Sequence, residues 1–143
     1  LVYVDAPTRE AVVEGMRTRR VYGATDNIIA DVRCGDHFMG EEFTTDKPPT
    51  LRVKLVGTDP GAEDVIVKDD EAVYSSKPEK QAVEFEWTDA QATPGKPSYY
   101  YVRGTQQGDT TTRKAKSPTG ETVEIPIHNG EVVWVSPMWI TVK

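Results

Sequence analysis

The chain has 143 residues and a formal net charge of -6 at pH 7, with an isoelectric point near 4.9. A chain of this length can bury its own core but is short for two domains. The acidic charge argues against nucleic acids and anionic membrane surfaces as partners. No apolar run approaches the roughly 18 residues of a membrane span, and the single cysteine excludes an intrachain disulfide.

An amphipathic helix is predicted over residues 8–20. Thr8 is a suitable N-cap, Glu10 lies in the first turn and arginines end the segment, all of which suit the helix dipole. The apolar face is formed by Val12 and Met16, which we predict to be an interface. A helix of this length is marginal alone, so we expect that face to pack on the rest of the chain, with a weak tendency to form a homodimer. The apolar face and its flanks comprise Ala11, Val12, Gly15 and Met16.

After Gly23 the sequence changes to the alternation of half-buried strands. Turn signals such as Gly35-Asp36 and Asp69-Asp70 separate the apolar runs, and Pro137 marks a bulge or an edge. About seven short, evenly spaced strands predict an immunoglobulin/fibronectin-like antiparallel β-sandwich with one N-terminal amphipathic helix. The apolar runs lie at residues 28–34, 51–55, 65–67, 73–74, 83–87, 99–103, 132–135 and 138–140.

We assign residues 1–25 to a helical segment and residues 26–143 to the sandwich domain. Residues 105–120 are polar and without periodicity, which predicts a long hairpin or loop. One core is expected from the apolar faces of the strands. It is predicted to contain Val83, Phe85, Trp87, Tyr100, Val102 and Trp134.

Side chains suited to catalysis or metal binding are scarce. His37 and His128, the two histidines, belong to no metal-ligand pattern, and His128 precedes an Asn-Gly turn where a solvated side chain is expected. Cys34 is in phase with apolar neighbours, which favours a buried thiol over a nucleophile. The carboxylate pairs at 41–42 and 69–70 indicate solvated turns or edges. The sequence therefore predicts no catalytic residue, no metal ligand and no cofactor in this chain.

Three aromatic residues are candidate surface contacts. Tyr99, Tyr101 and Trp139 could stack on a sugar ring if they lie exposed in one plane, whereas otherwise such residues fill a core or an interdomain seam. A free-standing ligand- or carbohydrate-binding module is therefore one hypothesis. Another is an intact enzyme with an unrecognised site, for which His37 or His128 beside carboxylates in a pocket would be the evidence.

Several segments resemble a known family. Residues 8–25 (TREAVVEGMRTRRVYGAT) are similar to the last helix of large bacterial proteins with a PHP-type phosphoesterase domain, the DUF3604 group. Residues 39–42 (MGEE) resemble its M-G-x-E segment, and residues 83–90 resemble a hydrophobic strand that ends in D-x. Residues 99–103 (YYYVR) and 136–140 (SPMWI) resemble two further motifs of the same group.

The resemblance implies that this chain is a C-terminal accessory region of a metal-dependent hydrolase. The metal ligands of the family lie upstream in its catalytic domain, and no position here matches them. A divalent metal is thus implied for the parent protein. The resemblance also implies that residues 1–25 are the tail of the catalytic domain, and that this domain of the same polypeptide is the partner of the chain. Gly15, Met16 and Ala24 depart from the Ala, Leu and Thr usual in the family, without threatening the fold.

Overall fold

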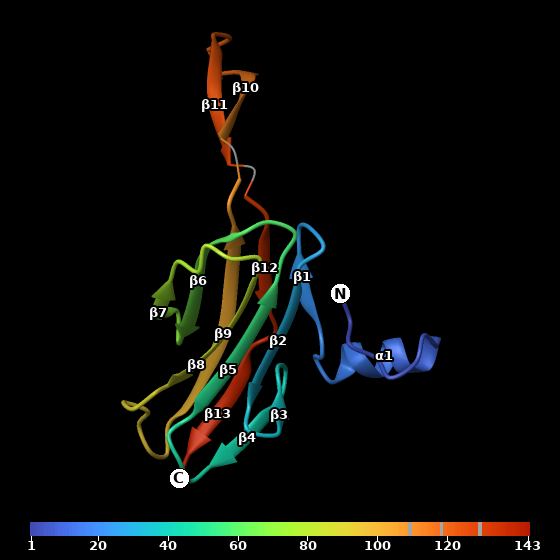
Figure 1. Cartoon of the computed structure of the whole chain (residues 1–143), viewed down its shortest axis with the longest axis vertical. Coiled ribbons are helices and arrows are strands. Elements are labelled where there is room, and N and C mark those ends of the chain that lie inside the picture. Colours follow the sequence, from blue (N-terminus) through green and yellow to red (C-terminus); the bar gives the residue numbers. More distant parts are fainter. Residues whose placement is uncertain (109, 118, 129) are drawn as a thin grey trace.

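The computed structural model describes residues 1–108, 110–117, 119–128 and 130–143 (Figure 1). It shows a chain made mainly of β-strands, with one short helix near the N-terminus. In chain order the elements are α1 (Arg9–Arg17), β1 (Tyr22–Ala24), β2 (Ile29–Cys34), β3 (His37–Phe38), β4 (Glu42–Thr45), β5 (Thr50–Val56), β6 (Gly61–Lys68), β7 (Glu71–Ser76), β8 (Ala82–Thr88), β9 (Pro97–Gln106), β10 (Thr110–Lys116), β11 (Thr122–His128), β12 (Val132–Val135) and β13 (Met138–Val142).

Two sheets form the body of the protein. The smaller sheet has the order β3-β2-β5-β8. In the larger sheet β6 lies between β7 and β9, and the other edge of β9 pairs first with β12 and then with β13. The larger sheet continues beyond β12 and β13. There β1 pairs with β12, and β4 pairs with β13 in the one parallel ladder among the described strands. The architecture is a largely antiparallel β-sandwich with an N-terminal helix, which confirms the predicted fold class.

Pro137 lies at a bulge, as the sequence predicts. Trp134 is opposite Arg103 and Met138 is opposite Tyr100, so three residues of the β12–β13 segment face two residues of β9. A bulge of this kind bends the strand and interrupts its pairing. The strand therefore changes its outer neighbour there, from β1 to β4.

The core follows the alternation seen in the sequence. Ala30, Val32 and Cys34 of β2 are buried against Leu51 and Val53 of the neighbouring β5, with at most 8% of any of these residues exposed. Burial raises the pKa of the Cys34 thiol, which agrees with a buried cysteine that takes no part in chemistry. The larger sheet contributes Ile66, Tyr100, Val102, Val133, Val135, Met138 and Ile140.

The predicted core needs two corrections. Val83, Phe85 and Trp87 are only partly buried, because β8 is an edge strand of the smaller sheet. Trp134 is 45% exposed, so its assignment to the core is wrong. Val133 is the buried residue beside it, and the pleat turns Trp134 to the opposite face.

Two predicted connections are present. Asp69 and Asp70 have φ angles of 47° and 71°, the positive values that suit a two-residue hairpin turn, and they join β6 to β7. The polar segment forms part of a hairpin, in which β10 pairs with β11 and projects away from the sandwich (Figure 1). His128 ends β11, but its side chain and residue 129 lie outside the part of the chain that is described, so their predicted turn role stays a prediction.

The predicted boundary after residue 25 falls after the first strand of the sandwich rather than before it. Tyr22–Ala24 pairs with β12, and Tyr22 is buried in the core. Residues 1–25 thus contain both the helix and one strand of the larger sheet.

Candidate functional site

The helix begins as predicted and ends earlier. The Thr8 hydroxyl accepts a hydrogen bond from the amide of Ala11 at 3.2 Å and thereby caps the first turn. The last helical residue is Arg17 rather than residue 20, because Arg19 has a φ of 58°. That left-handed conformation cannot continue a right-handed helix and costs about 1 kcal/mol for a residue with a side chain.

The helix lies against the N-terminal segment through a glycine. Gly15 is the buried residue of α1, and a Cβ there would lie 2.7 Å from Val2 Cγ1 and 2.8 Å from the carbonyl oxygen of Tyr3. The Tyr3 amide donates to the carbonyl of Arg20 at 2.8 Å, and the Tyr3 hydroxyl donates to the carbonyl of Ala30 at 2.6 Å. This close approach links the helix to the smaller sheet.

Arg19, just after the C-terminal end of the helix, contacts the sandwich. Its Nε donates to the carbonyl oxygen of Gly40 at 2.7 Å, and its guanidinium lies 4.9 Å from the centre of the Trp139 ring. Gly40 has a φ of 93°, and a Cβ there would lie 2.2 Å from the Arg19 carbonyl oxygen, so only glycine fits. Arg20 adds a weak ion pair with Glu41 at 4.0 Å. Residues from three of the segments that carry the family resemblance thus meet at this junction.

The apolar face of the helix is open to solvent. Val12, Val13 and Met16 are 37%, 40% and 59% exposed. We name these three residues the helix stripe. The expectation that the sandwich covers Val12 and Met16 is wrong. The helix instead packs through Gly15, on another side, where its backbone lies against Val2 and Tyr3.

The three candidate aromatic contacts share one face of the larger sheet. Tyr99 lies directly opposite Trp139, and Tyr101 is two residues further along β9, so the pleat places all three on one side. The Tyr99 hydroxyl donates to Asp70 at 2.6 Å, and this bond raises the pKa of Tyr99 to about 12. Arg19 lies over Trp139. The Trp139 ring is therefore covered by a cation, whereas the bond of Tyr99 involves only its hydroxyl, and the role of the three residues as a surface contact stays a prediction.

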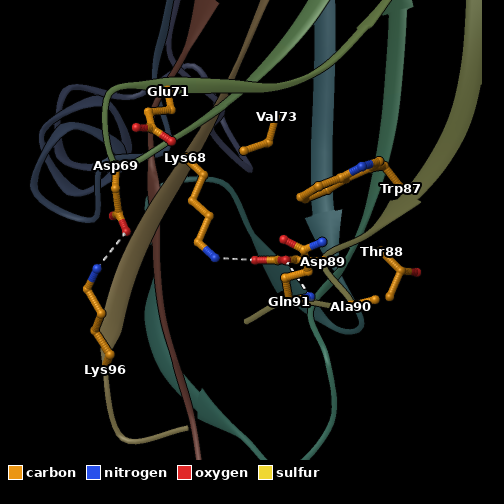
Figure 2. Close-up of a pocket in the computed structure, with 10 residues that line it drawn as sticks. All are labelled: Lys68, Asp69, Glu71, Val73, Trp87, Thr88, Asp89, Ala90, Gln91 and Lys96. Carbon is orange, nitrogen blue, oxygen red and sulfur yellow. Dashed lines mark hydrogen bonds and ion pairs between the residues drawn. The ribbon is translucent and has the colours of Figure 1, made fainter. Parts of the chain in front are cut away.

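A polar groove opens between the ends of the two sheets (Figure 2). Its volume is about 610 Å³. Lys68 reaches into it from β6 and Trp87 from β8, and the two side chains flank Asp89 (Figure 2). The lining comprises Lys68, Asp69, Glu71, Val73, Trp87, Thr88, Asp89, Ala90, Gln91 and Lys96.

Asp89 is the buried anchor of the groove. It accepts from Lys68 Nζ at 2.5 Å and from the Tyr100 hydroxyl at 2.7 Å through Oδ2, and from the Gln91 amide at 3.0 Å through Oδ1. Burial alone would raise the pKa of Asp89, but the bonds from Lys68 and Tyr100 outweigh it and lower that pKa below its ordinary value. Asp89 therefore holds the Lys68 ammonium in a fixed position.

A second carboxylate holds the outer part of the groove. Asp69 accepts from the Ser98 hydroxyl at 2.9 Å and from the Tyr99 amide at 3.1 Å, and Lys96 Nζ lies 3.7 Å from it. Together with Asp89 and Glu71, Asp69 gives the lining three carboxylates against the two ammonium groups of Lys68 and Lys96. The groove is thus close to neutral, with no excess of positive charge.

A further buried carboxylate lies between the sheets, away from this groove. Asp64 of β6 is 2% exposed, and its Oδ2 has no hydrogen-bond partner among the described residues. Its Oδ1 lies 3.2 Å from where a Cβ on Gly104 would be, among Leu55 and Val133. Burial, with a smaller contribution from Glu63, raises the pKa of Asp64 to about 6.

His37 lies in a hollow of about 480 Å³ that Cys34 and Asp46 also line. Its Nδ1 is 2.9 Å from Glu41 Oε2, and its ring stacks on Phe43 at 3.7 Å. A histidine beside carboxylates in a hollow is what the enzyme hypothesis requires, but the neighbouring Cys34 thiol is buried with a raised pKa and so is a poor nucleophile. Within the described ranges, no three His, Cys, Asp or Glu side chains converge as a metal site.

Sequence reasoning did not single out Lys68, Asp89 or Arg19. Lys68 alternates with the outward residues of β6 and so takes an inward position. A charged residue at an inward position was the feature of the sequence that could have indicated this site. Asp89 follows a strand, where an acidic residue ordinarily indicates a solvated turn.

Comparison with known proteins gave no matching family model, no matching curated protein and no matching solved structure. In the part of the chain that is described, no helix has the length and apolar character needed to cross a membrane. The fold and these sites define a β-sandwich domain that carries a helix attached at its C-terminal end and a polar groove.

Proposed function

We propose that this chain is a non-catalytic accessory domain of a PHP-type metal-dependent phosphoesterase, and that it packs on the catalytic domain of the same polypeptide through the helix stripe. The observation that supports this most directly is the combination of a helix attached to the sandwich at its C-terminal end with an uncovered apolar face. Val12, Val13 and Met16 stay in solvent although the C-terminal end of the helix is held against the sandwich. An exposed apolar patch is a typical contact surface.

The size of the helix stripe favours a tethered neighbour over a second copy of the chain. Covering it would remove roughly half of each side chain from water, or about 1 kcal/mol per residue. The association of two separate molecules costs about 4 kcal/mol or more, which three such residues do not exceed. A domain of the same polypeptide is present at an effective concentration in the millimolar range, so a small patch is enough.

The family resemblance adds the identity of that neighbour. In the DUF3604 group the segment similar to residues 8–25 follows the catalytic domain, so the helix would lie at the seam. The junction of Arg19, Gly40 and Trp139 would then set the angle at which the sandwich meets the catalytic domain.

The test compares amide hydrogen exchange of residues 9–17 in the complete gene product that carries this sequence and in the isolated 143-residue chain. We expect the helix to exchange more slowly in the complete product, and Met16→Glu to remove that difference without unfolding the isolated chain. Arg9→Glu is the matched control, since it changes the charge of an exposed helical residue outside the helix stripe. Equal exchange in the two forms, or a complete product without a catalytic domain, contradicts the proposal.

A further inference from the structure

We propose that the groove between β6, β7 and β8 is a binding site for a neutral oligosaccharide, with Trp87 as its stacking surface and Lys68 as a hydrogen-bond donor to sugar hydroxyls. The inference is independent of the accessory role, because it concerns a different surface of the sandwich and stands on the groove alone.

The first argument is the presence of a largely buried ion pair at the floor of the groove. The side chains of Lys68 and Asp89 are 18% and 6% exposed, and burying such a pair contributes little or nothing to stability compared with apolar residues of similar size. The pair does hold an ammonium group at a defined point. Lysine has three N–H donors, and the bond to Asp89 uses one of them, which leaves donors for a ligand hydroxyl.

The second argument is Trp87. Its indole is partly buried and lies 6.3 Å from the Tyr100 ring at an angle of 53°, so the core fixes its orientation. Trp87 also lines the groove, on the side opposite Lys68 (Figure 2). An immobilised aromatic ring offers a flat apolar surface at little entropic cost, and the C–H face of a pyranose ring is complementary to it.

The third argument is charge and composition. Lys68 is paired with Asp89 and Lys96 with Asp69, which leaves little attraction for a phosphate or another anion. A sugar hydroxyl both donates and accepts hydrogen bonds, so it can use the ammonium groups, the side-chain amide of Gln91 and the carboxylates in turn. The volume of about 610 Å³ is within the range of ligand pockets and is shared by polar groups and one aromatic ring.

The experiment is an NMR titration of the 15N-labelled chain with cellohexaose, xylohexaose and maltohexaose, each up to about 10 mM. A dissociation constant of about 10 mM corresponds to a binding free energy near -3 kcal/mol, so this range includes weak binding. We expect one of these probes to shift the indole N–H signal of Trp87 together with the amides of Lys68 and Gln91. The indole signal of Trp134, on the outer face of the larger sheet, should stay in place. Weaker binding by about tenfold is expected for Trp87→Ala, because a stacked ring contributes roughly 1.4 kcal/mol.

Trp87 also supports the core, so variants at the rim keep the test decisive. Lys96→Ala and Gln91→Ala change exposed residues and should weaken binding by about threefold or more, with unchanged unfolding midpoints. Trp134→Ala is the matched control and should leave the affinity as it is. No shifted signal with any of the three probes overturns the proposal. So does binding that survives Lys96→Ala and Gln91→Ala but is lost in Trp134→Ala, because that result would place the sugar on the outer aromatic face.

Discussion

Replacing Asp64 with asparagine should stabilise the protein, and the gain should depend on pH. Asp64 lies between the sheets beside Leu55 and Val133, and one of its oxygens has no hydrogen-bond partner among the described residues. The folded state holds its proton up to about pH 6, whereas the ordinary pKa is 3.8. The difference of about two units corresponds to roughly 3 kcal/mol of lost stability once the carboxyl is ionised.

The sign follows from the raised pKa. Below about pH 4 the carboxyl is protonated in both states, so Asp64 causes no electrostatic loss there. As the pH rises from about 4 to about 6 the unfolded state ionises first, stability falls, and the loss is complete above pH 6. Asp89 has the opposite sign, because its pKa is lowered and its contribution disappears as the pH falls below about 4.

The assay is urea unfolding of the wild type and of Asp64→Asn between pH 4 and pH 8. We expect a small difference at pH 4 and a gain of about 1–3 kcal/mol at pH 7.5, since asparagine keeps an imperfectly bonded polar group in the site. Asp59→Asn, at an exposed position on the loop before β6, makes the same chemical change at the surface and is the control. A gain that is the same at every pH, or a loss of stability at pH 7.5, would refute the reasoning.

Four further results are expected. Phe85→Ala should cost about 2–3 kcal/mol in urea unfolding, less than for a fully buried phenylalanine because β8 is an edge strand, and a cost under 1 kcal/mol would mean that its stack on Tyr74 contributes nothing. Gly40→Ala should lower the free energy of unfolding by about 2 kcal/mol or more, because the new Cβ would meet the Arg19 carbonyl, and an unchanged midpoint would show that the helix junction is not rigid. Asp89→Asn should cost about 2–4 kcal/mol by leaving the Lys68 ammonium uncompensated, and adding Lys68→Met should recover part of that loss; a double variant no better than the single one would argue against the pair. Metal analysis of the dialysed chain should give far less than one zinc, manganese or iron per molecule, whereas about one equivalent would reveal a metal site that the sequence and the described residues do not indicate.

The strands were predictable where a half-buried sheet imposes alternation. The pattern from Ile28 to Cys34 identifies β2 and its inward face, since each inward residue is apolar and most outward ones are not. The same reasoning failed at Val132–Val135. All four residues are apolar, so the sequence does not show which of them face the core. The size of Trp134 then suggested burial, although the pleat assigns that position to the surface.

The sites were less predictable than the fold because they join residues that are distant in the sequence. The period of the helix identifies Val12 and Met16 as its apolar face, but it cannot tell whether that face or a glycine meets the rest of the chain. Lys68 and Asp89 are 21 residues apart and come together only through the packing of two different sheets. No local sequence pattern predicts this contact, so the groove could be identified only from the structure.

The way the N-terminal segment encloses the helix has a consequence for how this domain can change. Val2 and Val21 form an antiparallel bridge, the Tyr3 amide donates to the carbonyl of Arg20, and the Tyr22 amide donates to that of Leu1. The helix therefore lies between two short segments, residues 1–3 and 20–22, that are joined to each other by main-chain hydrogen bonds. Most substitutions leave such bonds intact. The outer residues of the helix can diversify to follow a changing neighbour while the sandwich keeps its sequence, and a foreign helix of similar length could be grafted between the same two segments.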